Sequence, residues 1–228
     1  MKRPNQGNVR YFQNCDSHTK AYLLGFIAAD GCLQSNGASG SLGLTLTISE
    51  SDIQILEKLK QEIGCENRIY EIRGKMTHDK TKEKYHCRFQ LFNKLLYSDL
   101  LSYGLTPRKS ITMQNIVENI PQEYRKSFIL GYLDGDGSVT KNPKRTQLMV
   151  SFRGTKEFLN GIATELNLES KWLYKDKQKN CYSLVFWRKA DLTSFLQIYN
   201  NLDFYLTRKY ERFSDFLKID KDETISPS

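Results

Sequence analysis

The chain has 228 residues, of which 39% are hydrophobic, enough for one large domain or two small ones with a buried core. Lys and Arg number 34 against 26 Asp and Glu, and this net charge of +8 favours a polyanionic partner. The polar N-terminal segment lacks the apolar run of a signal peptide, no stretch is long enough to span a membrane, and the 5 cysteines form no CxxC pair. We therefore expect an intracellular protein, in the cytoplasm or an organelle and not secreted, with no membrane partner, CxxC zinc site or disulfide framework.

Residues 1–110 are predicted to form the first of two similar halves. Residues 1–16 have the composition of a loose basic arm, after which Asp16 or Ser17 can cap a helix that runs to about residue 30. Hydrophobic periodicity then predicts strands at 32–34 and 42–49, a helix at 52–63 that ends at Gly64, strands at 68–73 and 84–93, and a helix at 95–103. The predicted order is αββαββα.

Residues 121–228 repeat this order after a linker at 111–120. A second motif helix precedes predicted strands at 137–141 and 147–153, a helix at 155–166, strands at 171–175 and 180–188, and two further helices. Two related halves of this kind imply a pseudo-two-fold axis. The predicted class is α+β, with antiparallel sheets that pack one face on helices and leave the other face wet.

Two apolar runs, residues 23–31 and 129–137, each end in Asp-Gly. Each run carries a glycine near its start, Gly25 or Gly131, and another small residue one helical turn later. Small residues on one face let a partner backbone come close, so we expect the two helices to pack against each other at these glycines. Gly31 and Gly137 are expected to end the helices in the left-handed conformation.

Asp30 and Asp136 then lie at helix C-termini, where the macrodipole is negative and a carboxylate is unfavourable. A bound cation would relieve this cost and the repulsion between the two carboxylates. Carboxylates are hard oxygen ligands suited to magnesium, which can activate water and stabilise charge in phosphodiester hydrolysis. A general acid–base pair, as in glycosidases, is the alternative, but a buried helix pair and basic sheets argue against a sugar cleft.

The predicted outer faces of the sheets are polar and basic. Two such faces side by side on a basic protein would form a saddle that enters the major groove of double-stranded DNA. Each residue alone also fits an ordinary solvent-exposed sheet face. Periodicity does not decide whether Trp187 lies on this face or in the core. The predicted DNA-binding residues are Gln34, Thr45, Thr47, Arg73, His86, Arg88, Gln90, Thr140, Lys141, Lys144, Gln147, Ser151, Arg153, Lys175 and Arg188, with the turn lysines contacting phosphates.

The two motif stretches resemble the LAGLIDADG motif of the homing endonucleases, with Asp30 and Asp136 at the acidic eighth position. The sixth position holds Ala28 in one copy and Asp134 in the other, so Asp134 is not an automatic third ligand. The resemblance spans about residues 18–217. It implies a monomeric, site-specific endonuclease that uses Mg²⁺, or manganese in its place, to cut both strands of a long, asymmetric DNA target.

The resemblance also assigns roles to four further residues. The main-chain carbonyls of Ala29 and Gly135 would help to bind metal, and Lys109 and Lys209 would lie near the scissile phosphates, although either fits equally well as a surface lysine at a helix start. An intron RNA maturase, which binds its host intron RNA on the same fold, is an alternative and can coexist with cleavage. A catalytically inactive DNA-binding regulator is another, and Asp at both eighth positions argues against it.

Overall fold

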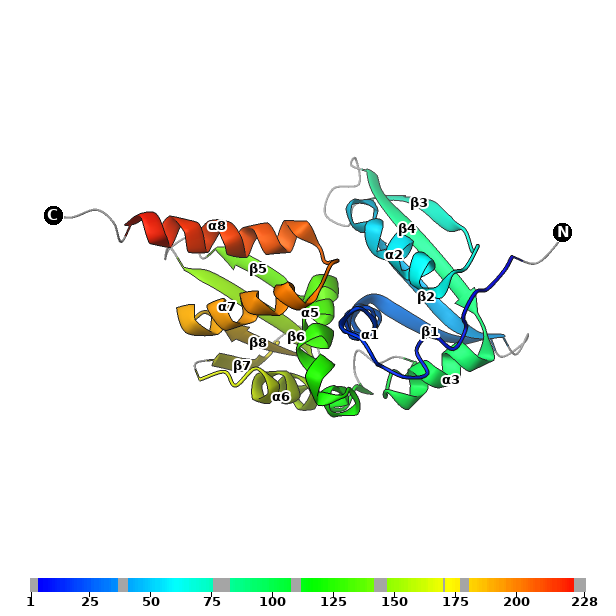
Figure 1. Ribbon diagram of the computed structural model, residues 1–228, viewed down its shortest axis with the longest axis horizontal. Helices are drawn as coiled ribbons and strands as arrows, with labels where there is room; N and C mark the ends of the chain where they lie inside the picture. The colour runs from blue at the N-terminus through cyan, green and yellow to red at the C-terminus, as the bar shows by residue number, and fades with distance from the viewer. Residues whose placement is uncertain are drawn as a thin grey trace.

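The computed structural model describes residues 4–36, 41–75, 83–107, 112–141, 147–169, 171–176 and 181–223. The first half contains α1 (His18–Asp30), β1 (Gly31–Asn36), β2 (Ser41–Ser49), α2 (Gln54–Ile63), β3 (Ile69–Lys75), β4 (Glu83–Phe92) and α3 (Lys94–Ser102). The second half contains α5 (Arg125–Asp136), β5 (Ser138–Lys141), β6 (Leu148–Gly154), α6 (Lys156–Glu165), β7 (Lys171–Lys175), β8 (Tyr182–Phe186), α7 (Lys189–Leu196) and α8 (Thr207–Glu223). The predicted α+β class and the two αββαββα halves are confirmed (Figure 1).

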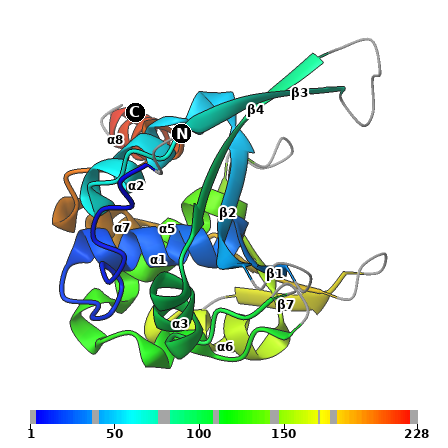
Figure 2. The same ribbon diagram turned by 90° about the vertical axis from the view of Figure 1, so that its right-hand side faces the viewer.

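Each half contains a four-stranded antiparallel sheet, in the orders β1-β2-β4-β3 and β5-β6-β8-β7. The inner face of each sheet packs on helices through alternate residues such as Leu44, Leu46, Val150 and Phe152, all of them buried. Both sheets lie on the same side of the central helices (Figure 2). Among the described residues, no helix combines the length and the apolar composition needed to cross a bilayer.

Helices α1 and α5 run side by side at the centre of the molecule and join the two halves (Figure 1). A Cβ atom at Gly25 would overlap the main-chain carbonyl of Phe128, and one at Gly131 would overlap that of Tyr22. The two backbones are therefore in direct contact, because glycine removes the only side-chain atoms that would hold them apart.

The expectation of a loose N-terminal arm is wrong for the described residues. Tyr11 and Phe12 are buried in the core, and the Arg10 guanidinium forms a 2.6 Å ion pair with the buried carboxylate of Asp99 in α3. Two adjacent aromatic side chains outweigh the polar composition around them, because their burial removes a large apolar area from water. Ser17 then caps α1 by accepting a hydrogen bond from the backbone.

The glycines after the motif helices are not left-handed caps. Gly31 has φ −71° and ψ 144°, and Gly137 has φ −86° and ψ 168°, so the chain leaves each helix in an extended conformation that enters the next strand. Glycine is required there for space: a Cβ at Gly31 would lie 2.5 Å from the Ile27 carbonyl oxygen, and one at Gly137 would lie 2.7 Å from that of Leu133. The signal of glycine after a helix was correct, but the physical reason is steric and not a positive φ.

Candidate functional site

The two motif helices bring Asp30 and Asp136 together at their C-terminal ends. Both residues are exposed. A Cβ at Gly135, the residue before Asp136, would lie 3.3 Å from Asp30 Oδ2, and would overlap the Cβ of Ala29. Because β1 begins directly after Asp30 and β5 begins one residue later after Asp136, the pair lies where the two sheets start.

Two helix C-termini and two carboxylates converge on this point, and each of them favours a positive charge there. The nearby Tyr132 shows the effect: burial, and then the charges of Asp136 and Asp30, raise the pKa of its phenol. The two exposed carboxylates, together with the main-chain carbonyl oxygens of the preceding residues Ala29 and Gly135, form a set of hard oxygen donors. Such a set fits a divalent cation. No group of three or more His, Cys, Asp or Glu that could hold a metal occurs in the described part of the chain, so water or substrate oxygens would have to complete the shell.

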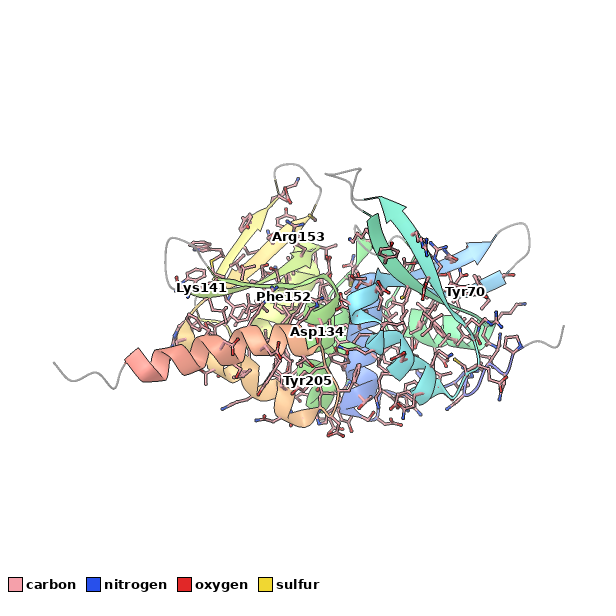
Figure 3. All side chains as sticks on the ribbon, turned by 90° about the horizontal axis from the view of Figure 1, so that it is seen from above. Tyr70, Asp134, Lys141, Phe152, Arg153 and Tyr205 are labelled. Atoms are coloured by element: carbon pink, nitrogen blue, oxygen red, sulfur yellow. The ribbon has the colours of Figure 1, made fainter. Side chains whose placement is uncertain are left out.

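Asp134 has a different role from the two exposed carboxylates. It is 1% exposed, and its Oδ2 accepts hydrogen bonds from the Tyr22 hydroxyl (2.7 Å) and the Leu206 backbone N–H (3.0 Å). Burial raises the pKa of Asp134 to about 6. Asp134 lies where the two halves meet (Figure 3), and its hydrogen bonds tie α5 to α1 and to the segment before α8. The only sequence signal for this role was a second acidic residue inside an apolar run.

Lys209 is 3% exposed, so the alternative interpretation of this residue as a surface lysine is wrong. Its ammonium donates to the carbonyl oxygens of Asp134 and Gly137, each at 2.8 Å, and to that of Leu133. Burial lowers the pKa of Lys209 to about 8. The Asp134 carbonyl lies in the last turn, where the helix supplies no backbone partner, and the Leu133 carbonyl also accepts from the Gly137 N–H. The lysine therefore holds the end of α5 and does not present its charge to solvent. Lys109 lies outside the described residues.

A single protein-family model matches one segment in each half of the molecule. The LAGLIDADG-like domain family matches residues 17–99 and 123–200, which is more than two thirds of the chain. The chain belongs to this family.

Solved LAGLIDADG structures and one curated protein are similar to this chain. The I-LtrWI LAGLIDADG homing endonuclease bound to target DNA aligns with a TM-score of 0.56 at 15% identity, over 96% of this chain and 92% of that one. Meganuclease I-SmaMI bound to uncleavable DNA aligns with a TM-score of 0.54 at 14% identity, over 87% of this chain and 88% of that one. At these identities the likeness shows a shared fold.

The curated relative is a probable translation initiation factor IF-2 of Methanocaldococcus jannaschii. It is 25% identical over 213 residues, which cover 86% of this chain but only 16% of that protein. The LAGLIDADG chain thus spans a small part of the relative's length.

The outer face of the first LAGLIDADG sheet carries a connected set of polar side chains. Thr45 donates to Gln34 Oε1 and accepts from Gln90 Nε2, both at 3.1 Å, and Arg88 Nε donates to Thr47 at 3.2 Å. The strand register places His86 on the same face, opposite Ser49. This face therefore presents a guanidinium, an imidazole and two amides, and its cross-strand bonds hold three of them in place.

The outer face of the second LAGLIDADG sheet carries fewer hydrogen-bonding groups. Ser151 and Arg153 lie on it, opposite Val185 and Ser183, and Arg153 is exposed (Figure 3). Thr140 lies on the same face opposite Met149, and Gln147 precedes β6 as a half-buried residue. Trp187 follows the inward-facing Phe186, and its ring centroid lies 4.3 Å from that of Trp172, which places it on the outer face.

Four predicted DNA-binding residues do not lie on the outer faces. Arg73, Lys141 and Lys175 pair with Tyr85, Leu148 and Tyr182, whose side chains share the face of the core residues. Arg188 forms an ion pair with Glu169 beyond the end of β8. The strands extend past the core, so residues at their ends are exposed on the inner face as well as on the outer one. Lys144 lies outside the described residues.

Proposed function

We propose that this chain is a monomeric, site-specific DNA endonuclease that uses a divalent metal to cut a long, asymmetric duplex. One observation carries the proposal: Asp30 and Asp136 lie together at the ends of α1 and α5, where the two sheets start. Family membership supports it. So do the solved structures of I-LtrWI and I-SmaMI with DNA, among them I-SmaMI bound to cleaved DNA.

The carboxylates of Asp30 and Asp136, with the main-chain carbonyls of Ala29 and Gly135, would hold magnesium or manganese. A bound metal would supply an activated water and neutralise charge on the phosphate. The solved structure of I-SmaMI with calcium ions supports a divalent cation in this role. Each half contributes one carboxylate, so we assign one strand of the duplex to each half.

Other residues of the chain keep this pair in place. Lys209 holds the last turn of α5 through three carbonyls, and Asp134 links α5 to α1 through Tyr22. We assign Lys209 a positioning role, because its ammonium is buried and engaged with the backbone. A fixed helix end reduces the reorganisation needed to bring the carboxylates to the substrate.

The outer sheet faces would read bases in the major groove, and exposed lysines at their rims would contact phosphates. The proposed base-reading set comprises Gln34, Thr47, His86, Arg88, Gln90, Thr140, Gln147, Ser151 and Arg153. The predicted contact of Thr45 with DNA is not retained, because Thr45 is buried and its hydroxyl holds Gln34 and Gln90. We assign the phosphate role to Lys141 and Lys175, which are exposed at the ends of β5 and β7.

Cleavage in the presence and absence of metal tests the proposal. A cognate duplex recovered from a randomised library is expected to be cut on both strands with magnesium or manganese, and to be bound but not cut in excess EDTA. Cutting in excess EDTA would contradict metal dependence. Binding to structured RNA, with no duplex DNA enriched, would favour the maturase alternative.

Replacing Arg88 by Ala tests the base-reading face. An exposed arginine in the major groove pairs best with guanine N7 and O6, so the variant is expected to lose about 1–3 kcal/mol of binding and to relax the preference at one base pair. Lys141→Ala is the matched control: it should weaken all sequences alike and reduce the salt dependence. The measurement is a binding profile over all single-base variants of the site at several salt concentrations. Equal weakening of every variant by Arg88→Ala would show that the reading face is wrongly assigned.

A further inference from the structure

An aromatic cluster lies on the outer face of the second sheet, and the proposed base-reading set above does not use it. Trp172 and Tyr174 in β7 are 53% and 52% exposed. Their strand partners are Val185 and Ser183, which in turn pair with Ser151 and Arg153 on the same face. Trp187 packs against Trp172 with ring centroids 4.3 Å apart. We call Trp172, Trp187 and Val185 the indole cluster.

The corresponding face of the first sheet has different chemistry. There the row Thr47–Arg88–Tyr70 matches Arg153–Ser183–Tyr174 in the second sheet, because each row crosses the equivalent three strands. By the same register, the pair Thr45–Gln90 matches Ser151–Val185. Where the first half has Arg88 and Gln90, the second half has the buried Ser183 and Val185. The guanidinium of the first row is carried in the second half by Arg153, which matches Thr47.

The pair Ser151–Val185 continues to a third residue, in β7, which is also apolar where the first sheet has a polar residue. Trp172 pairs with Val185, and its equivalent beside Gln90 is Arg68, the residue before β3. The two sheets therefore have similar strands and register, but the second sheet has the apolar pair Trp172 and Val185 where the first has Arg68 and Gln90. A hydrogen-bonding surface suits purine edges, whereas an apolar surface in the major groove suits the thymine methyl group, which is the only apolar group there.

We propose that the second half reads thymine methyl groups of its half-site through Trp172, held in place by Trp187 and Val185. This inference rests on the proposed function, since it assigns a base preference to one half of the same DNA surface. The target would then be asymmetric in chemistry, with hydrogen-bonded purines under the first sheet and methyl contacts under the second.

The charge around the indole cluster favours duplex DNA over a protein partner. Arg153 is exposed on the same face, and Lys171 and Lys175 are exposed at the two ends of β7. Cations spaced around an apolar surface suit a groove with phosphates on both sides. Packing of Trp172 on Trp187 also limits the side-chain freedom that would be lost on binding.

The test uses uracil, which differs from thymine only by the absence of the methyl group. Each thymine of a duplex recovered by the wild-type protein from a randomised library is replaced by deoxyuridine, one position at a time, and binding is measured. We expect one or two positions in the second half-site at which uracil lowers affinity about fourfold, the value of one buried methyl group. Trp172→Ala should bind thymine and uracil equally at those positions, and Trp172→Phe should retain part of the difference.

Lys171→Ala is the matched control, since Lys171 is the neighbouring residue in β7 and its strand partner is the inward-facing Phe186. It should keep the wild-type difference between thymine and uracil. A thermal melt establishes that the Trp172 variants are folded. An unchanged thymine–uracil profile in Trp172→Ala would overturn the inference while leaving the endonuclease proposal intact. If no duplex is enriched at all, both proposals fail.

Discussion

Asp30→Asn and Asp136→Asn are each expected to stop double-strand cleavage and to leave binding of the cognate duplex unchanged. Asparagine keeps the size of the side chain but removes the negative charge that would hold a divalent cation. Loss of a group that merely supports a metal ligand already costs about 10–100-fold, so loss of a ligand itself should lower the cleavage rate by at least about a hundredfold. Cleavage is measured on a supercoiled plasmid that carries the site, and binding by gel shift.

The plasmid also separates the two strands, because nicked and linear products migrate differently. Asp203→Asn is the matched control: Asp203 is an exposed aspartate in the segment before α8 and belongs to neither motif helix. It should cut like the wild-type protein. Linear product formed at the normal rate by either motif variant would contradict the assignment of these carboxylates to the metal.

Gly25→Leu and Gly131→Leu are expected to give the largest losses of stability. A new Cβ at either position meets the main chain of the partner helix, at Phe128 or at Tyr22, and a backbone cannot rotate away as a side chain can. Overpacking a core typically costs about 1–3 kcal/mol, and we expect both variants at or beyond the upper end of that range. Urea denaturation followed by circular dichroism gives the free energy of unfolding.

The control is Gly74→Leu in β3, where the nearest atom to a new Cβ is the Lys84 carbonyl oxygen at 3.8 Å. This ordinary contact distance should leave the midpoint close to that of the wild-type protein. Wild-type stability in both motif variants would mean that the two backbones are not in contact at these glycines. A loss confined to one variant would place the contact at one glycine only.

Much of the fold was predictable because its signals are local in the chain. The alternation of Leu44, Leu46 and Ile48 identifies both a strand and its inner face, since side chains on a strand have a period of two. Gly25 and Gly131 predict the helix contact, because a small residue in an otherwise apolar helix has little other use. The Asp-Gly endings likewise located the candidate site from the sequence.

The tertiary structure decided the features that depend on partners far apart in the chain. Asp134 lies 112 positions from Tyr22 and 72 from Leu206, so no sequence window contains the bonds that bury its carboxylate. The burial of Lys209 was missed for the same reason: the sequence suggested a lysine near the scissile phosphates or a surface lysine, and the carbonyls that hold it lie more than 70 positions away.

The sequence also could not predict on which face of the sheet an exposed residue lies. Arg73 and Arg88 are both arginines in strands, but the register turns Arg73 toward the inner face and Arg88 toward the outer one. A shift of one residue in pairing would exchange the two faces, and only the packing of the whole sheet on its helices fixes that register. Sequence therefore determined which residues form the sheets, and tertiary packing determined which of them lie on the outer faces.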